Sequence, residues 1–264
     1  MKKIIALILA LVTLTCCTFA LSSCKNEEEL IIGITYFAPM NYKDADGKLV
    51  GFETEFAEAV CKELGMKPKF QEIDWEAKEN ELNGKTIDCI WNGMTITSER
   101  AETMAISIPY MKNKQVLVVK EENLAQYTVD SDLTGKSLVA EKKSAGETAA
   151  QTDEYLKKAS YTGVDKMATA LMEVKSGTAD ACVIDYVTAL GSIGEGTDYA
   201  DLVVVEALTF GAEEQYGIAF RKGEDDAQLV KDVNAAIQKL AENGELKRIA
   251  EKYNLEDYLL VGNN

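Results

Sequence analysis

The 264-residue sequence contains no histidine, a common catalytic and metal-binding side chain. Without histidine the chain cannot build a Ser-His-Asp or Cys-His catalytic arrangement, nor a metal site with imidazole ligands. Basic residues are also scarce, because 28 Lys and Arg stand against 44 Asp and Glu and give a formal net charge of −16. A protein that follows nucleic-acid phosphates needs a basic face, so we expect no nucleic-acid partner.

What is present is typical of a folded protein. Hydrophobic residues make up 47% of the chain and charged residues 27%, which is enough to bury a core and close to the globular average. The length fits one large domain or two ordinary ones.

The first residues have the pattern of a secretory signal. Lys2 and Lys3 precede an uncharged apolar run from Ile4 to Ala20, and the small-residue segment Leu21-Ser22-Ser23-Cys24 follows. A transmembrane helix is the alternative, but the run is short for a span and polar residues follow it at once. We therefore interpret residues 1–23 as a signal peptide.

The end of this segment resembles the bacterial lipobox, in which the cysteine becomes the lipidated first residue of the mature protein. Cys24 is the predicted lipidation site, with palmitate or similar acyl chains, and residues 24–29 form the lipidated tether. Cys16 and Cys17 are poorer candidates, because a small residue does not precede them as the lipobox requires. The resemblance implies a protein held at the extracytoplasmic face of the membrane, periplasmic or at the cell surface, through its lipid anchor only.

Three cysteines remain beyond the predicted anchor, namely Cys61, Cys89 and Cys182. Their odd number and the absence of a CxxC pair argue against a disulfide framework. All three lie in apolar helical or strand-like patterns, so we predict buried free thiols, with one disulfide as the alternative.

Helical and strand-like patterns alternate along the rest of the chain, which is typical of an α/β fold. Strands are predicted at residues 30–35, 69–73, 87–91, 115–120, 137–140, 181–184, 202–205 and 216–220. Helices are predicted at residues 53–64, 76–82, 147–159, 165–175, 186–193, 225–242 and 244–253. Gly65 is the expected C-cap of the first helix, and Asp165 the expected N-cap of the fourth.

A weak internal repeat accompanies this alternation. Residues 83–90 (NGKTIDCI) resemble residues 175–182 (KSGTADAC), and each segment has a helix end, a small turn and a strand with an aspartate near its start. Two similar α/β lobes would explain the repeat.

The segment that ends at Arg100 carries the most chemical information. A predicted strand ends at Trp91, Gly93 permits unusual backbone geometry, and Thr95 and Thr97 offer hydroxyls. The Arg100 guanidinium suits a carboxylate, and ligands of open α/β sheets bind beyond the carboxyl ends of strands. The alternative is a surface arginine paired with a neighbouring glutamate.

Residues 93–100 (GMTITSER) strongly resemble a signature of bacterial extracellular solute-binding proteins for polar amino acids, the family of glutamine-binding and lysine-arginine-ornithine-binding proteins. The segments at 33–42, 50–55, 180–185 and 215–220 match further motifs of that family in the same order. The resemblance implies a two-lobed, periplasmic-binding-protein-like (type II) α/β fold with two hinge strands.

The resemblance also implies the division into lobes. Lobe 1 would comprise residues 30–110 and 216–264, and lobe 2 residues 116–211. The two crossing strands near 110–115 and 211–216 would form the hinge.

By the same resemblance, the site is a clamp for the zwitterion of an amino acid. Arg100 would hold the α-carboxylate with backbone N–H groups of Thr95 and Gly146. Asp185 would hold the α-ammonium with the Gly93 carbonyl and the Thr95 hydroxyl. Desolvated charges are tolerable only when paired and hydrogen-bonded, so the arrangement agrees with elementary electrostatics.

Two of these assignments depend on local structure. Ala145 and Gly146 open a predicted helix after Ser144, and free N–H groups at a helix N-terminus attract an anion. For Asp185 the alternative role is the N-cap of the helix that follows.

Aromatic side chains would form the walls of the site. Trp75 aligns with the family aromatic that packs on the ligand side chain, and either Tyr36 or Phe37 aligns with the other. Without the resemblance to the family, the sequence pattern alone predicts that these aromatic residues pack in the core.

Departures from the family pattern bear on ligand choice. The first-loop aspartate that binds the distal cation in the basic-amino-acid binders is replaced here by Thr35 or Ile34, which disfavours arginine, lysine and ornithine. Lys142 or Lys143 would meet a polar or acidic ligand side chain, and Asn92 would assist. The preferred ligand is therefore a polar uncharged amino acid or cystine.

The function implied by the resemblance is ligand capture for an ABC importer, with a permease and its ATPase as partners. We expect a monomer that is not an enzyme and uses no cofactor and no metal. One alternative is a dehydratase-like enzyme on the same fold, with Glu141, Asp185 and Lys142 as its titratable groups. A soluble amino-acid sensor is the other.

Overall fold

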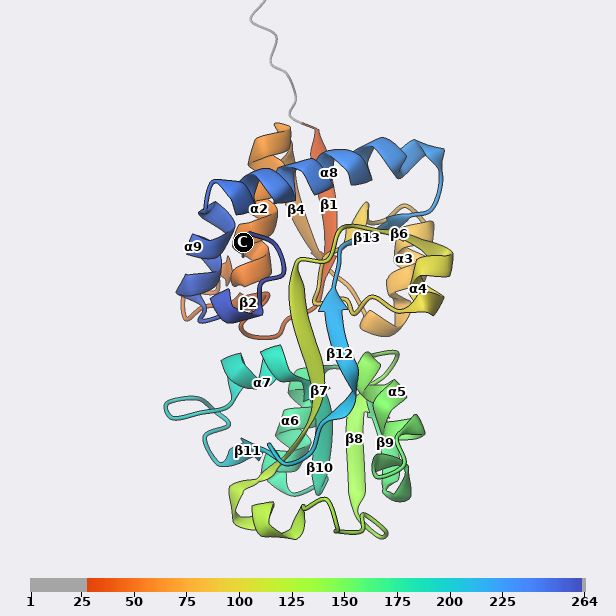
Figure 1. Cartoon of the computed structure of the whole chain (residues 1–264), viewed down its shortest axis with the longest axis vertical. Coiled ribbons are helices and arrows are strands. Elements are labelled where there is room, and N and C mark those ends of the chain that lie inside the picture. The colour runs from red at the N-terminus through yellow and green to blue at the C-terminus, as the bar shows by residue number, and fades with distance from the viewer. Residues whose placement is uncertain (1–27, 263–264) are drawn as a thin grey trace, which may run out of the picture.

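A computed structural model describes residues 28–262, so the predicted signal peptide and Cys24 lie outside the described residues. These residues form two α/β lobes stacked along the long axis of the molecule (Figure 1). The two-lobed fold expected from the sequence is thereby confirmed.

The upper lobe in Figure 1 is built on a five-stranded sheet with strand order β4-β1-β5-β13-β6. Its first three strands are parallel, and β13 is antiparallel to both of its neighbours. The strands are β1 (Glu29–Ile34), β4 (Lys67–Glu72), β5 (Cys89–Ile90), β6 (Met104–Ile106) and β13 (Ala219–Arg221), with a separate hairpin of β2 (Tyr42–Lys43) and β3 (Leu49–Val50).

Helices cover both faces of this sheet. Side chains of α2, α8 and α9 pack into the main core cluster, whereas Trp75 and Leu82 pack with Ile87 and Met104 into a second cluster. The helices are α2 (Phe52–Leu64), α3 (Lys78–Asn83), α4 (Ser98–Thr103), α8 (Glu224–Glu242) and α9 (Glu245–Lys252), with short 3₁₀ turns η1 (Trp75–Ala77) and η4 (Glu256–Tyr258).

The lower lobe contains a sheet of strand order β11-β7-β10-β8-β9, with β12 also paired to β7. Its strands are β7 (Met111–Lys120), β8 (Ser137–Glu141), β9 (Ser160–Val164), β10 (Ala181–Asp185), β11 (Leu202–Val204) and β12 (Phe210–Tyr216). Its helices are α5 (Ala145–Thr152), α6 (Met167–Ser176) and α7 (Tyr186–Ser192), with 3₁₀ turns η2 (Glu121–Gln126) and η3 (Leu156–Lys158).

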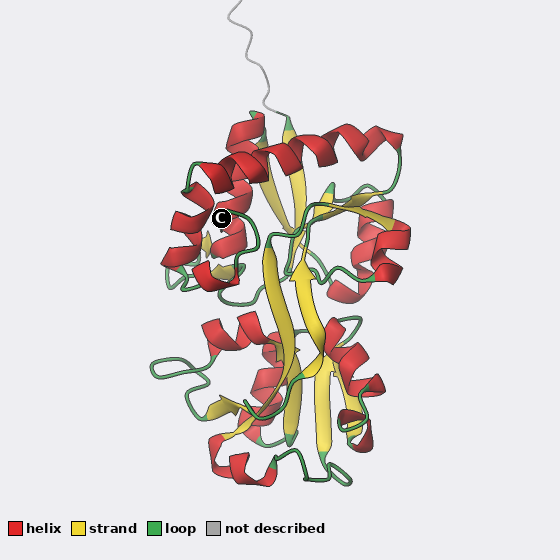
Figure 2. Cartoon of the chain, viewed as in Figure 1, coloured by secondary structure: helices red, strands yellow, loops and turns green. Residues whose placement is uncertain are grey.

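Two long strands connect the lobes. β7 and β12 run antiparallel, with Met111 opposite Tyr216, and they cross side by side between the lobes (Figure 2). The chain therefore enters the lower lobe along β7 and returns along β12. A pair of adjacent strands is a suitable hinge, because small backbone rotations at their ends move one lobe relative to the other.

The internal repeat seen in the sequence has a structural counterpart. Asp88 Oδ2 accepts a hydrogen bond of 2.8 Å from the backbone N–H of Ile31, on the strand next to β5. Asp180 Oδ2 accepts an equivalent 2.8 Å bond from the N–H of Ser137, on the strand next to β10. In both lobes an aspartate just before an inner strand fixes the neighbouring parallel strand.

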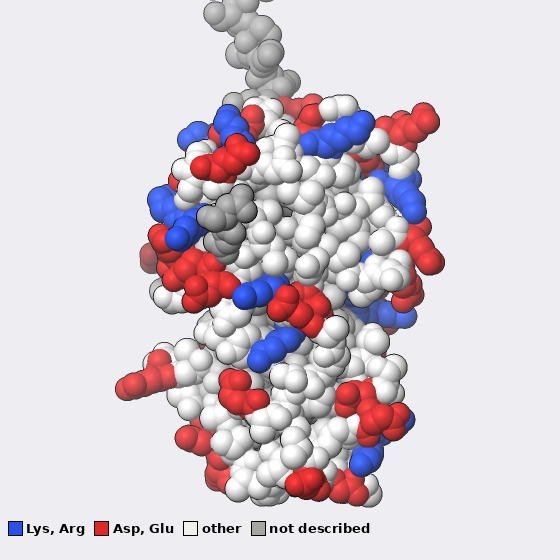
Figure 3. All heavy atoms as spheres, in the orientation of Figure 1, with Lys and Arg blue, Asp and Glu red and all other residues white. Residues whose placement is uncertain are grey.

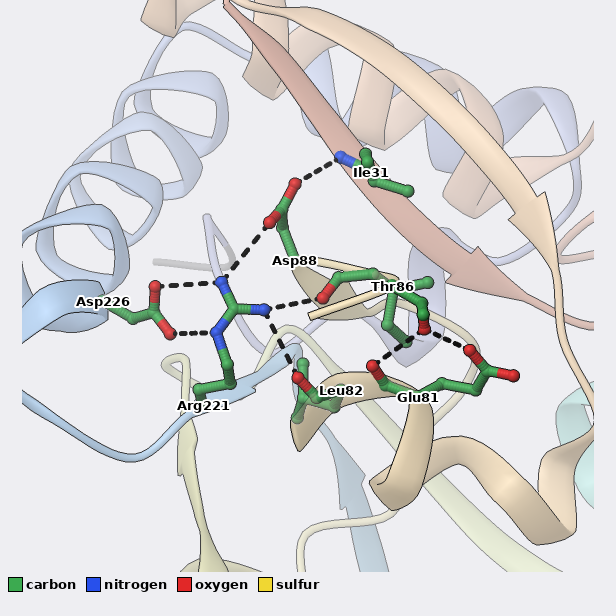
Figure 4. Close-up of polar contacts among 8 residues, drawn as sticks. Ile31, Glu81, Leu82, Thr86, Asp88, Arg221 and Asp226 are labelled. Atoms are coloured by element: carbon green, nitrogen blue, oxygen red, sulfur yellow. Dashed lines mark hydrogen bonds and ion pairs between the residues drawn. The ribbon is translucent and has the colours of Figure 1, made fainter. Parts of the chain in front are cut away.

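In the upper lobe, Asp88 also belongs to a partly buried ion cluster (Figure 4). Arg221 Nε lies 2.8 Å from Asp226 Oδ2, and its Nη2 lies 3.3 Å from Asp88 Oδ1. Arg221 Nη1 donates to the carbonyl of Ile87 at 2.7 Å. The guanidinium thus joins β13 to the start of α8 and to the segment before β5, and its role is structural.

The secondary structure corrects the sequence prediction at three places. The helix predicted at 147–159 ends at Thr152, because Asp153 Oδ1 accepts from the N–H groups of Tyr155 and Leu156 and starts a new turn. Asp165 does not cap the next helix, whose N-cap is Lys166. Asp165 instead pairs with Lys142 at 2.7 Å.

The third correction concerns the strand predicted at 216–220. It is divided at Gly217 and Ile218, because β12 belongs to the lower sheet and β13 to the upper one. A Cβ on Gly217 would lie 2.6 Å from Ile106, so the glycine permits close packing where the chain changes lobe.

Other local predictions are confirmed. Gly65 is the C-cap of α2 with a φ of 68°, in the left-handed region that glycine adopts readily. Cys61, Cys89 and Cys182 are buried free thiols.

Within residues 28–262, no helix combines the length and apolar character needed to span a bilayer.

Candidate ligand-binding site

A small pocket lies between the two lobes. Residues of both lobes line it, namely Trp75, Asn92, Gly93, Thr95, Arg100, Glu141, Ser144, Ala145, Met167 and Asp185. Contacts across the cleft hold it closed, because Lys166 pairs with Glu72 at 2.9 Å and Ser192 Oγ donates to the Ala38 carbonyl at 3.4 Å.

One end of the pocket is suited to an anion. The hydroxyl of Thr97 caps α4 and positions Arg100 in its first turn. Arg100 Nη1 donates to the Thr95 carbonyl at 2.7 Å, and Nη2 donates across the cleft to the Lys143 carbonyl at 3.1 Å. Burial lowers the pKa of Arg100, but a guanidinium stays cationic at neutral pH. The alternative of a surface arginine paired with a nearby glutamate does not describe this geometry.

The opposite lobe contributes a helix start to the same end. Ser144 is the N-cap of α5, and its Oγ accepts from the N–H of Glu147 at 3.0 Å. Ala145 lines the pocket beside Ser144. The first N–H groups of a helix have no intrahelical partner and favour negative charge, so this helix start adds to the positive potential near Arg100.

The other end of the pocket is suited to a cation. Asp185 ends β10 and is buried. Its Oδ1 accepts from Asn113 Nδ2 and Gln115 Nε2, both at 2.6 Å. Asp185 does occupy the N-cap position of α7, but its side chain makes no capping hydrogen bond. Its carboxylate is therefore directed to the hinge strand rather than to the helix.

A second carboxylate, which the sequence analysis missed, shares these donors. Glu214 Oε2, from strand β12, accepts from Asn113 at 3.0 Å, from Gln115 at 2.9 Å and from Thr95 Oγ1 at 3.1 Å. Burial, followed by repulsion from Glu214, raises the pKa of Asp185 to about 7. Two adjacent acids are both ionised most easily when a cation lies beside them.

Buried side chains of the upper lobe support the Gly93 loop, which lies between these two ends of the pocket. Gly93 has a φ of 55°, and a Cβ there would lie 3.1 Å from Phe37 Cζ. Its N–H donates to Glu53 Oε1 at 2.7 Å, and the Tyr110 hydroxyl donates to the same oxygen. Burial raises the pKa of Glu53 to about 7. Glu53, which the sequence analysis treated only as part of a helix entry, thus connects the loop to the start of the hinge.

A third missed residue, Lys78, lies behind Trp75, which lines the pocket. It is buried, and its Nζ lies 4.5 Å from the centroid of the Trp75 ring. Nζ donates to the carbonyls of Trp75 at 3.1 Å and Lys143 at 3.2 Å. Burial, together with repulsion from Arg100, lowers its pKa to about 8. The Lys143 carbonyl therefore joins two cations of the upper lobe to the lower lobe.

Four of the residues predicted for the site are not among those lining the pocket: Tyr36, Phe37, Lys142 and Gly146. Lys142 pairs with Asp165 and lies 3.9 Å from Glu76, so its charge is already matched outside the pocket. Lys43 lies over the Tyr36 ring, and Phe37 packs under Gly93. Lys142 therefore lies outside the proposed set of ligand contacts.

The fold and the site together define a class of protein. Two α/β lobes joined by two crossing strands enclose a pocket with one cation and two carboxylates, which is the arrangement of a binding protein that closes on a small charged solute. The chain belongs to the bacterial extracellular solute-binding proteins, family 3, whose model matches residues 30–256.

Relatives of known specificity support this placement. The chain is 30% identical over 239 residues to the L-cystine-binding protein TcyJ of Escherichia coli (strain K12), covering 88% of this chain and 85% of that protein. It is 29% identical to the arginine-binding extracellular protein ArtP of Bacillus subtilis (strain 168), covering 96% and 98%.

A solved structure agrees with the fold. An ABC uptake transporter substrate-binding protein from Streptococcus pneumoniae, with bound histidine, is 34% identical and superposes with a TM-score of 0.76. The match covers 88% of this chain and 94% of that one. These relatives are amino-acid-binding proteins, and the family is one of solute binding rather than catalysis.

Proposed function

We propose that this protein captures an L-amino acid in the cleft between its lobes and delivers it to an ABC permease driven by an ATPase. The observation that carries the proposal is the placement of Arg100 and Asp185. They come from opposite lobes and line one pocket. An α-amino acid has one carboxylate and one ammonium, so it pairs with both groups only when the lobes are closed.

Hinge closure follows from this division of the site. A ligand shifts a conformational equilibrium only by its difference in affinity for the two states. In the open state the ligand keeps the contacts of one lobe, and closure adds those of the other. β7 and β12 are the strands that must bend.

The proposed ligand is a polar uncharged amino acid or cystine. Both present the α-zwitterion that Arg100 and Asp185 require. The likeness to the L-cystine-binding protein makes cystine the first ligand to test.

Partners follow from the same proposal. Acidic side chains lie on both lobes of the drawn face (Figure 3), and we propose that they pair with basic residues of the permease. The protein would act as a monomer without a cofactor, and it would release its ligand chemically unchanged.

A thermal-unfolding screen tests the binding function. Protein that has been unfolded and refolded to remove bound ligand should be heated with each standard amino acid and with cystine. A ligand at 1,000 times its Kd stabilises the folded state by about 4 kcal/mol. That corresponds to a rise in Tm of about 10 °C for a protein of this size class. No shift with any of these ligands would contradict amino-acid binding.

The lipid anchor is a separate part of the proposal. Cys24→Ser should move the protein from the membrane fraction to the soluble fraction and abolish palmitate labelling, because Cys24 is the proposed acylation site. Cell fractionation with an antibody measures this. Cys17→Ser is the matched control and should stay on the membrane. Membrane attachment that survives Cys24→Ser would show that another segment holds the protein there.

A further inference from the structure

Among the described residues that line the pocket, Glu141 is the one charged residue that the amino-acid clamp does not use. It ends strand β8, the residue is 2% exposed, and it lines the same pocket as Trp75 and Met167. We propose that Glu141 determines specificity by binding a cationic group on the ligand side chain. This inference rests on the proposed function and names the class of amino acid that the site accepts.

The first argument is the charge of the pocket. Its lining contains the cation Arg100 and the acids Asp185 and Glu141. The α-carboxylate and α-ammonium of a ligand neutralise Arg100 and Asp185, which leaves Glu141 as a buried acid. The ionised form of this acid is unfavourable unless it is paired, so a second cation on the ligand would stabilise the ionised form and complete the balance.

Within residues 28–262, no Lys or Arg side chain forms an ion pair with Glu141. The Glu141 carboxylate accepts a hydrogen bond from the backbone N–H of Met167, which leaves further acceptor capacity. Lys78 is the cation that acts on Glu141 electrostatically. Its Nζ, however, donates to the carbonyls of Trp75 and Lys143 and lies over the Trp75 ring.

The surroundings of Glu141 agree with an extended side chain that ends in a cation. Trp75 and Met167 are apolar surfaces on opposite lobes, and both line the pocket next to the acid. Apolar walls with one precisely placed charge select a ligand by both shape and charge. Aliphatic stems of basic amino acids and the half of cystine that bears the second ammonium both fit this description.

Protonation decides how Glu141 behaves without such a ligand. Burial and repulsion from Asp185 raise its pKa to about 8, whereas Lys78 and the Met167 N–H lower it and Asp74 raises it. At neutral pH the ligand-free acid holds its proton for much of the time. A ligand whose side chain is cationic favours the ionised form of Glu141 and forms an ion pair with it. A ligand whose side chain is neutral contacts the protonated carboxyl, which forms only a neutral hydrogen bond.

With Glu141 in this role, the site favours side chains that carry a cation over the polar uncharged side chains also proposed above. The sequence disfavours arginine, lysine and ornithine, because Thr35 or Ile34 stands where the basic-amino-acid binders have their first-loop aspartate. Glu141 offers a carboxylate from the other lobe, so basic amino acids join cystine as ligands to test.

Calorimetric titration with matched ligands tests the proposal. Arginine and citrulline differ by the charge of the side-chain head, and cystine and S-methylthiocysteine differ by the second zwitterion. In at least one pair, the member with the additional guanidinium (arginine) or ammonium (cystine, which also adds a carboxylate) should bind at least 10-fold more tightly to the wild-type protein. Glu141→Gln should weaken that member at least 10-fold and reduce the preference to within about threefold.

The controls separate this inference from the proposed function. Asp165→Asn removes an exposed acid of the same lobe, which pairs with Lys142, and should leave both affinities unchanged. Neutral members that bind as tightly as cationic ones, or a preference that survives Glu141→Gln, would overturn the role of Glu141 while leaving amino-acid binding intact. If none of these ligands and no standard amino acid binds, the proposed function fails and the inference fails with it.

Discussion

Replacing Arg100 with alanine should weaken the binding of every α-amino acid by about 100-fold or more. The substitution leaves the ligand carboxylate buried in the closed cleft without its cation, and truncating one partner of a buried, hydrogen-bonded charge pair costs about 2–5 kcal/mol. It also removes the 3.1 Å bond from Nη2 to the Lys143 carbonyl, which joins the lobes. Calorimetric titration of the wild-type protein and the variant with the same ligand measures the loss.

Two further variants make the result specific. Arg100→Lys keeps the charge but loses the planar pair of donors, so we expect an affinity between those of wild type and Arg100→Ala. Arg248→Ala removes an exposed arginine whose partner is Glu245 on the same helix, and it should bind like the wild type. Undiminished affinity in a folded Arg100→Ala protein would refute the carboxylate assignment.

Replacing Asp185 with asparagine should weaken α-amino ligands by about 30-fold or more, because the ammonium loses its buried counter-charge. An analogue that lacks the α-amino group makes no such contact, so its affinity should not fall. Equal losses for the two ligands would indicate that Asp185 serves the structure of the site rather than the ammonium. No loss for either would remove Asp185 from the site.

The pH dependence of binding gives an independent readout of the same carboxyl. The pKa of Asp185 in the ligand-free protein is raised to about 7, mainly by burial and then by Glu214. The ammonium binds the ionised form, so affinity should fall as the pH decreases below 7, by up to about tenfold per unit. Arg100 and the amides of Asn113 and Gln115 face the group and favour ionisation. The slope should become shallower in Asp185→Asn, because this variant lacks the carboxyl that must ionise to bind the ammonium.

The sequence predicts the fold well because the signals are local and repeated. The alternating apolar segments correspond to observed helices and strands, and the glycine after α2 caps that helix. Asp88 and Asp180, at equivalent positions of the internal repeat, make equivalent hydrogen bonds in the two lobes. The motif that contains Gly93 and Arg100 also directs attention to the pocket. These residues lie close together in the chain, so their geometry is set by one turn and one helix start.

What the sequence does not predict depends on packing between distant segments. Glu214 lies on a crossing strand and meets Thr95, 119 residues away, only once the lobes are assembled. The sequence pattern is typical of a surface lysine at Lys78, on a short helix. In the structure Lys78 is buried and donates a hydrogen bond to the Lys143 carbonyl of the other lobe. Glu141 and Lys142 are adjacent, yet one lines the pocket and the other pairs at the surface. Because side chains alternate between faces at a strand end, a shift of one residue exchanges these roles.

In the proposed mechanism, one pocket binds both charged groups of an amino acid, its α-carboxylate and its α-ammonium. The most direct measurement is calorimetric titration of the refolded, ligand-free protein with the best amino acid from the thermal screen, with its α-amide and with its deaminated analogue. We expect one site per chain, tight binding of the amino acid, and losses of about 30-fold or more for each analogue. If either analogue binds as tightly as the amino acid, the clamp formed by Arg100 and Asp185 is contradicted.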